Sequence, residues 1–283
     1  AYPKLAGDGT TTWETLMAHE FSHHWWGDLA TCRTAEDMWL NEGWAVFSEH
    51  LFTEWTYGRT AYVNAVSTNF LDVLQNTHVE EGGYRAVSGL PHDLTYGSHV
   101  YNKGAVVAHN LRGYLGDSLF RQGLRIVLNE TAFADWSSEE LRDKLSAATG
   151  SDLHDFFDDW VFQPGFTHFS VDSVKVTYSP IDAPTQMQVF VRQKLRGAVH
   201  FYQNVPVEFT FVYPDWSRET RTAMLSGENS APTFEFPAWQ PAPSFVWVNT
   251  NGLLTFARAE KEKVVKNLGS SNFTPARMDL KIN

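Results

Sequence analysis

The chain has 283 residues, of which 33 are acidic and 22 are basic, so its formal net charge is −11. This balance, with no Lys/Arg cluster, excludes nucleic acid and anionic membrane surfaces as expected partners, and no apolar run is long enough to span a membrane. Hydrophobic residues make up 43% of the chain, which argues against disorder, and the single cysteine, Cys32, rules out an internal disulfide.

The first part of the chain, up to about residue 163, has mostly helical spacing of its apolar residues. Residues 1–10 are expected to form a loop, and the abrupt start suggests that the chain is a piece of something longer. A capping-box signature, Ser137 with Glu140, opens the sixth expected helix, which ends at Gly150. The expected helices cover residues 10–29, 35–55, 59–77, 98–116, 117–130, 136–150 and 151–165, with a loop rich in Gly, Pro and His over 82–97.

After Gly165 the apolar period changes to two, which is typical of strands. Alternation is clear over residues 187–191 and 205–213, and residues 243–252 predict a strand running into an Asn-Gly turn. The recurring turn signals favour a small antiparallel sandwich. We therefore expect a helical lobe over 1–165, a β-sandwich over 166–257 and a polar C-terminal tail over 258–283.

A histidine pair dominates the first expected helix. His19 and His23 lie one helical turn apart, so their imidazoles share a face and can hold one zinc ion. Glu20 follows the first histidine, where this motif places a general base beside the metal. The alternative is a partly buried helix with chance histidines, because histidine is common here, at 11 of 283 residues.

The position of a third ligand separates the classes of zinc site. The three-histidine pattern needs a glycine and a third histidine where the chain has Trp26 and Leu29, so that class is excluded. Glu42, in "WLNEGWA", follows His23 after 18 residues, a length that suits a turn into an antiparallel helix. With Glu42 as the third ligand, the fourth coordination position of the metal would stay open, as in catalytic zinc sites. The alternative for Glu42 is an ordinary surface acid, although its apolar neighbours would make a lone buried carboxylate costly.

These motifs resemble the aminopeptidase N family of gluzincin zinc peptidases, which includes the leukotriene-hydrolysing aminopeptidase. The resemblance is carried by "HEFSH", 18 residues and "NEG", together with "HWWGDL", "WLNEGWAVFSE" and "YNKGA". "DLHDFFDDWVFQPGF" resembles the end of the family's helical lobe, and the part after it resembles the sandwich that follows. The resemblance implies an α+β fold: a mainly helical, thermolysin-like catalytic lobe followed by an antiparallel β-sandwich.

Carried over residue by residue, the resemblance implies a zinc peptidase site. His19, His23 and Glu42 would bind one Zn²⁺ per chain, and Glu20 would be the general base that later passes its proton to the leaving amine. Tyr101, in "YNKG", would donate a hydrogen bond to the oxyanion. From the residues alone, Tyr101 fits a buried helical tyrosine better.

Three further residues are candidates for contacts with the metal ligands or with the substrate. Glu49, two turns beyond Glu42, could orient a zinc histidine or be a surface acid. Tyr96 lies where one family member has a second active-site tyrosine. Asp28 stands where the family commonly has Asn, and it would add negative charge near the metal face. No pattern assigns a role to the histidines on either side of Tyr101.

The implied function is a zinc-dependent aminopeptidase acting on peptides with a free N-terminus. The family's Gly-x-Met-Glu-Asn-like segment, which grips that amino group, is not in this sequence, so we expect a truncated piece whose parent has further domains. Two alternatives stay open: an endopeptidase or epoxide hydrolase with the same site, and an inactive, zinc-stabilised binding module. Residue preference, oligomeric state and compartment are not indicated.

Overall fold

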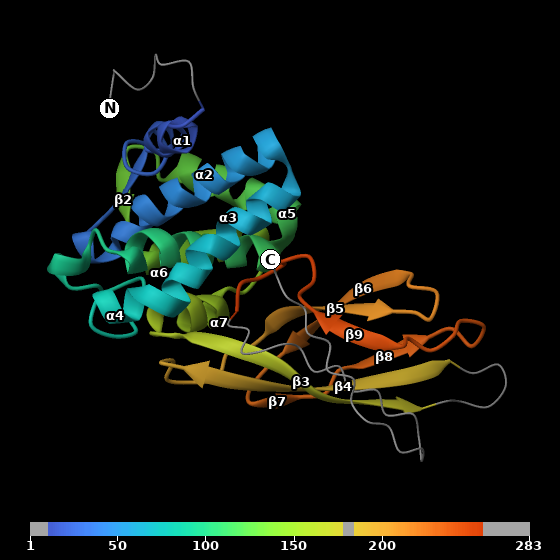
Figure 1. Ribbon diagram of the computed structural model, residues 1–283. Coiled ribbons are helices and arrows are strands. Elements are labelled where there is room, and N and C mark those ends of the chain that lie inside the picture. The colour runs from blue at the N-terminus through green and yellow to red at the C-terminus, as the bar shows by residue number, and fades with distance from the viewer. Residues whose placement is uncertain (1–10, 178–183, 257–283) are drawn as a thin grey trace. The chain divides into compact units, whose positions relative to one another are not determined.

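The chain forms two compact units, Ala1–Gly165 and Phe166–Asn283. The structure, a computed structural model, describes residues 11–177 and 184–256; the loop expected at 1–10 and the tail expected at 258–283 lie outside them. The described part of the first unit is mainly helical, and that of the second consists of antiparallel strands (Figure 1). The expected α+β class is confirmed.

The helical unit is arranged around α2, which packs against α1, α3 and α5. Within the described ranges, no helix is long and apolar enough to cross a membrane. The α-helices are α1 (Glu14–Ser22), α2 (Glu42–Tyr57), α3 (Arg59–Asp72), α4 (His78–Glu80), α5 (Gly104–Glu130), α6 (Ser138–Thr149) and α7 (His154–Phe157). Short 3₁₀ turns cover Ala35–Leu40 and His92–Leu94, and π-helical turns cover Val73–Thr77, His99–Lys103 and Asp158–Phe162.

The first two expected helices are shorter than their apolar patterns indicated, and the helix expected over 151–165 is only α7 followed by the π-helical turn Asp158–Phe162. The first ends at Ser22, and further along the chain turns at Gly27, whose φ of 139° is rarely open to residues with a side chain. The second is interrupted at Asn41, so that Glu42 is the first residue of α2. By contrast, the capping box of Ser137 and Glu140 is confirmed at the start of α6.

The helices expected over 98–116 and 117–130 form one element with two irregularities. The segment begins as the π-helical turn His99–Lys103 and continues as α5. Gly116, with φ of 71°, kinks α5 at the expected junction. The π-helical turn carries Tyr101, and such turns often mark functional sites.

A stack of tryptophans fills the core behind α1 and α2. The ring centroids of Trp26 and Trp44 lie 4.6 Å apart, and Trp136 stacks on Trp26 at 6.3 Å. Trp136 closes a two-stranded parallel sheet that the sequence did not predict, between β1 (Ala30–Cys32) and β2 (Ala134–Trp136). Aromatic burial on this scale contributes strongly to stability.

The second unit is a two-sheet sandwich. One sheet has the order β3-β4-β7, with β8 also paired to β4, and the other has the order β6-β5-β9. Phe211 joins the sheets, because its ring centroid lies 4.8 Å from that of Phe234 and 5.0 Å from that of Phe236. The strands are β3 (Phe166–Thr177), β4 (Thr185–Arg196), β5 (Val205–Val212), β6 (Arg218–Leu225), β7 (Asn229–Ser230), β8 (Thr233–Phe236) and β9 (Phe245–Val248).

The buried side chain of His50 makes stability depend on pH. His50 is 5% exposed, and burial lowers its pKa from 6.5 to about 4. Between these values the unfolded chain binds more protons than the native one, so stability is lost as the pH falls from 6.5 towards 4. The loss is about 3 kcal/mol at most.

Urea unfolding of the wild type and of His50→Gln at several pH values would check this expectation. Glutamine can still accept the hydrogen bond from Asn69. The variant should lose less stability than the wild type between pH 6.5 and pH 4. An equal loss in both proteins would mean that His50 titrates normally.

Candidate metal centre

Helix α1 places two histidines on the same side. His19 lies in its last turn, and His23 follows at the C-cap with helical backbone angles, so the one-turn spacing is kept. His19 is buried and His23 is half-buried. The pair therefore presents two imidazoles towards α2, the helix against which α1 packs.

Hydrogen bonds at the rear of each ring determine which nitrogen faces the centre. Nδ1 of His19 donates to Oε1 of Glu49 at 2.8 Å, and Nδ1 of His23 donates to the carbonyl of Trp26 at 2.8 Å. Because each Nδ1 carries a proton held by its own hydrogen bond, Nε2 is the atom of each ring that becomes a metal ligand once it loses its proton. Metal-binding histidines usually have such a partner behind the ring.

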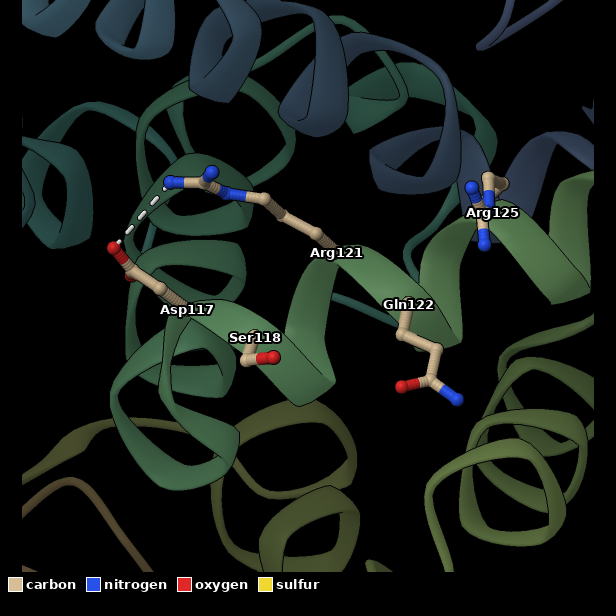
Figure 2. A pocket seen from close by; sticks show the side chains of 5 residues that line it. All are labelled: Asp117, Ser118, Arg121, Gln122 and Arg125. Carbon is tan, nitrogen blue, oxygen red and sulfur yellow. Dashed lines mark hydrogen bonds and ion pairs between the residues drawn. The ribbon is translucent and has the colours of Figure 1, made fainter.

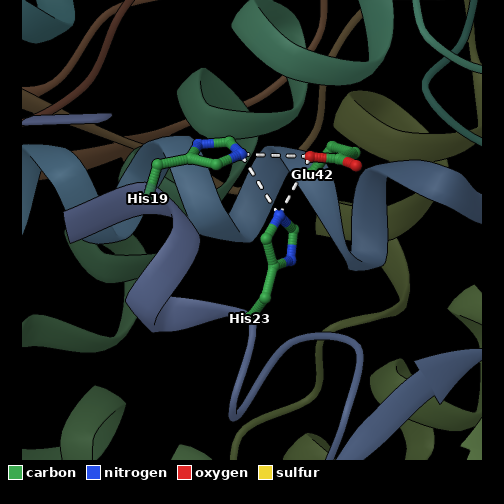
Figure 3. Close-up of side chains that lie close together, drawn as sticks. All are labelled: His19, His23 and Glu42. Atoms are coloured by element: carbon green, nitrogen blue, oxygen red, sulfur yellow. Dashed lines mark hydrogen bonds and ion pairs between the residues drawn. The ribbon is translucent and has the colours of Figure 1, made fainter. Parts of the chain in front are cut away.

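The two Nε2 atoms converge with a carboxylate oxygen of Glu42 (Figure 3). Oε2 of Glu42 lies 3.2 Å from Nε2 of His19 and 3.3 Å from Nε2 of His23, and the two Nε2 atoms are 3.2 Å apart. The three atoms form a nearly equilateral triangle. Glu42 reaches it as the first residue of α2.

The size and chemistry of this triangle fit zinc. Zinc bonds to histidine nitrogen and carboxylate oxygen are about 2.0–2.2 Å long, so neighbouring ligands in a tetrahedron lie about 3.3–3.5 Å apart. The three separations in the structure are 3.2, 3.2 and 3.3 Å. Two imidazoles with one carboxylate are also a donor set found in catalytic zinc sites.

The three side chains of the triangle strongly shift one another's pKa values. Burial would lower the pKa of His19, but hydrogen bonds to Glu42 and then to Glu49 outweigh it and raise that pKa to about 9. Burial would raise the pKa of Glu42, but hydrogen bonds from His19 and His23 bring it down to about 2. The carboxylate thus attracts positive charge to this point, and a proton and a metal ion compete for the same atoms.

Glu20 and Tyr101 lie next to the triangle. Glu20 follows His19 on α1 and has an exposed side chain. The Tyr101 ring stacks on His19, with centroids 6.1 Å apart and an interplanar angle of 13°. Burial, and then the charge of Glu42 and a hydrogen bond to that carboxylate, raise the pKa of Tyr101, with smaller contributions from Tyr96 and Glu20. The Tyr101 phenol therefore stays protonated and available as a donor.

The three further candidates, Glu49, Tyr96 and Asp28, lie in different surroundings. Glu49 is behind His19, as described above. Tyr96 is 69% exposed, and its electrostatic effect on Tyr101 places it near the site. Asp28 is exposed and lies 3.4 Å from Nδ1 of His24, which is itself exposed. In the structure, Asp28 thus pairs with a side chain outside the triangle.

Asn41, the residue before Glu42, makes contacts that the sequence analysis missed. Its side chain donates to Oγ1 of Thr31 and accepts from the backbone N–H of Cys32, both at 3.0 Å. These bonds tie the start of α2 to β1 and so fix Glu42, the next residue. The "NEG" motif was the available signal.

A contact between two glycines was missed as well. A Cβ atom on Gly43 would lie 2.8 Å from both Cα of Gly104 and the carbonyl oxygen of Val100. Backbone therefore touches backbone where α2 meets the end of the π-helical turn. Gly43 follows Glu42, and Gly104 comes three residues after Tyr101. The contact between the two glycines therefore limits the distance between the side chains of Glu42 and Tyr101.

A surface hollow on α5 is not part of this centre. It has a volume of about 440 Å³ and is lined by the side chains shown in Figure 2. Its carboxylate, on Asp117, is already paired with Arg112 and Arg121. The lining residues are Asp117, Ser118, Arg121, Gln122 and Arg125, which offer no metal-ligand set.

The hydrogen bond behind His19 predicts an effect on metal affinity. Glu49→Ala removes the acceptor of the Nδ1 proton without touching a ligand atom, and we expect metal affinity to fall about 10- to 100-fold. Glu80→Ala is a control, because that residue is exposed on the short α4. Competition with a fluorescent zinc chelator would measure both. Equal affinities in the two variants would refute the orienting role of Glu49.

Comparison with known proteins agrees with this geometry. The model of the peptidase family M1 domain matches residues 5–160. A His-Glu-x-x-His helix opposed by a glutamate on the next helix defines a metallopeptidase class. The chain belongs to peptidase family M1.

Similar proteins carry aminopeptidase names. "Probable aminopeptidase 1" of Sulfurisphaera tokodaii is 31% identical over 165 residues, covering 56% of this chain and 20% of that protein. "Aminopeptidase N" of Lactococcus lactis subsp. lactis is 30% identical over 172 residues, covering 57% and 20%. The chain thus spans about a fifth of the length of the curated relatives that it matches.

A solved structure shares the fold. The crystal structure of Legionella pneumophila aminopeptidase A in complex with aspartic acid aligns with a TM-score of 0.63 and 18% sequence identity. The alignment covers 87% of this chain and 27% of that one.

Proposed function

We propose that this chain carries the catalytic site of a zinc-dependent aminopeptidase, which removes N-terminal residues from peptides. The observation that carries the proposal is the triangle formed by His19, His23 and Glu42, with Glu20 and Tyr101 beside it. Membership of peptidase family M1 supports the same reaction class.

His19, His23 and Glu42 would hold the zinc ion. When bound, zinc supplies Lewis-acid polarisation of the scissile carbonyl and lowers the pKa of water to about 7. Glu49 and the carbonyl of Trp26 keep the two imidazoles in the required tautomer.

Glu20 is the proposed general base. It takes a proton from the attacking water, whose oxygen forms a bond to the carbonyl carbon. When the C–N bond breaks, Glu20 returns that proton to the leaving amine, so the carboxylate is regenerated. Its exposed position next to His19 suits a group that must reach both water and substrate.

Tyr101 is the proposed donor to the oxyanion. Its phenol keeps its proton because burial and Glu42 raise its pKa, so it can donate throughout the neutral pH range. A donor directed at the developing negative charge stabilises the transition state more than the ground state.

The proposed substrate is a peptide with a free amino terminus, and metal content and substrate choice test the proposal together. Elemental analysis of the purified chain should give one zinc per chain. Aminoacyl-aminocoumarins should be hydrolysed, whereas their N-acetylated counterparts should not.

Each other outcome would point to a different function. Equal hydrolysis of the blocked substrates would favour an endopeptidase, and turnover of an epoxide alone would favour an epoxide hydrolase. Bound zinc without turnover of any substrate would favour a zinc-stabilised binding module. A chain that binds no zinc would contradict the ligand assignment itself.

A further inference from the structure

A buried polar cluster lies behind the π-helical turn that carries Tyr101. His99 and Lys103, two residues before and two residues after Tyr101, are 2% and 6% exposed. Two residues correspond to about half a helical turn, so these side chains point away from the Tyr101 ring. Their partners are Glu81, which directly follows α4, and Arg85, which lies in the loop after it.

The imidazole of His99 is held from both ends. The backbone N–H of Arg85 donates to its Nε2 at 3.1 Å, so the proton must be on Nδ1. That Nδ1 donates to Oε2 of Glu81 at 2.5 Å. Burial lowers the pKa of His99, which agrees with a neutral ring. The ring thus joins a carboxylate to a backbone amide in one fixed orientation.

Lys103 fixes the other end of the turn to the same residue of the loop. Its Nζ donates to the carbonyl oxygen of Arg85 at 2.5 Å. Arg85 therefore bonds His99 through its N–H and Lys103 through its carbonyl. In the described part of the chain, no carboxylate forms an ion pair with Lys103. Burial without such a partner lowers the pKa of this amine to about 7.

The packing around Glu81 leaves little room for the carboxylate to move. A Cβ atom on Gly97 would lie 2.5 Å from Oε1 of Glu81. The carbonyl of Gly97 in turn accepts from the backbone N–H groups of Val100 and Tyr101, at 2.9 and 3.2 Å. The cluster is thereby linked to the backbone of Tyr101 itself.

We propose that Glu81, His99 and Lys103 are positioning residues, which hold the π-helical turn so that the Tyr101 phenol faces the metal centre. This inference rests on the proposed role of Tyr101 as oxyanion donor. A buried lysine and a largely buried glutamate side chain cost stability when compared with apolar side chains of similar size. What Lys103 and Glu81 provide is directional hydrogen bonds, which fix the backbone on the side of the π-helical turn opposite to Tyr101.

The first test compares kinetics in two backgrounds. In the full chain, Glu81→Ala and Lys103→Met should each lower kcat about 10- to 100-fold, with KM and zinc content nearly unchanged. In a Tyr101→Phe background the same substitutions should change kcat less than about twofold, because the donor that they position is absent. Glu81→Gln keeps a carbonyl acceptor for His99 and should restore much of the rate.

Tyr62→Phe is the matched control. It removes a buried hydrogen bond, between the Tyr62 hydroxyl and Nδ1 of His109 at 2.6 Å, in the same helical unit but outside the cluster. It should lower the thermal unfolding midpoint as the cluster variants do and leave kcat unchanged. If Glu81→Ala fails to fold, Lys103→Met still tests the proposal, because it retains the unbranched stem and loses only the bond to Arg85.

A second readout needs neither zinc nor substrate. With tyrosine labelled by ¹³C at Cζ, the Tyr101 resonance, assigned by its loss in Tyr101→Phe, should be single and narrow in the wild type. It should broaden or split in Glu81→Ala and Lys103→Met. An unchanged resonance, or kcat losses that multiply with that of Tyr101→Phe, would overturn the positioning role. A perturbed resonance in a chain without turnover would support positioning while contradicting the proposed function.

Discussion

Replacing Glu20 by glutamine is expected to lower kcat about 100- to 10,000-fold, because the amide cannot accept a proton from the attacking water. The metal content should not change, since Glu20 contributes no atom to the triangle of His19, His23 and Glu42. The side chain is exposed and the replacement has the same shape, so stability should also be preserved. Turnover of an aminoacyl-aminocoumarin gives kcat, and zinc measured on the same sample gives the metal content.

Glu14→Gln is the matched control for this substitution. Glu14 begins the same helix and receives a hydrogen bond from Tyr57, away from the ligand atoms. The same loss of charge on α1 should therefore leave kcat within about twofold of the wild type. If Glu20→Gln kept full turnover, or if both variants lost it equally, Glu20 would not be the general base.

Gly43→Ala is expected to damage stability and catalysis together. The added Cβ would meet Cα of Gly104 and the carbonyl oxygen of Val100 at 2.8 Å, and backbone atoms cannot rotate away as a side chain can. Overpacking of this kind costs about 1–3 kcal/mol of unfolding free energy. We also expect kcat to fall about 10- to 100-fold, because separating α2 from the π-helical turn moves Glu42 away from Tyr101.

Gly123→Ala, on α5, separates the two effects. Its Cβ would meet side-chain methyl carbons of Thr149 and Leu145, at 2.7 and 3.2 Å, instead of backbone. This variant should lose stability without losing kcat at a temperature where it is fully folded. Urea unfolding and steady-state kinetics on both variants would measure the difference. A Gly43→Ala protein with normal kcat would show that the glycine contact does not determine the geometry of the site.

The local part of the site could be predicted from the sequence, because it depends on short spacings. His19 and His23 needed only the period of a helix, and Glu42 needed a chain length that allows an antiparallel return. The hydrogen bond from Nδ1 of His23 to the carbonyl of Trp26 could not be predicted from the sequence pattern, because it depends on the turn that follows α1. Apolar periodicity also could not locate the break at Asn41, which is caused by bonds to Thr31 and Cys32 in another element.

The fold shows the same division between local and distant information. Alternating residues predicted β4, β5 and β9, but the strand order within each sheet depends on pairing between distant segments. The parallel pair of β1 and β2 joins segments about a hundred residues apart, and neither strand is longer than three residues. Such pairings leave no local signal, because hydrophobic packing around them decides whether they form.

The shortness of α1 would make its folding depend on a metal ion bound at the triangle. The helix has nine residues, and Trp13 at its N-cap makes no capping side-chain bond. Helices of this length are marginal by themselves. A metal ion would tie α1 to α2 through His19, His23 and Glu42, so metal binding and local folding of α1 are linked equilibria. Chains starved of metal are therefore expected to open first at α1 and to be degraded from there, and metal-loaded chains to survive.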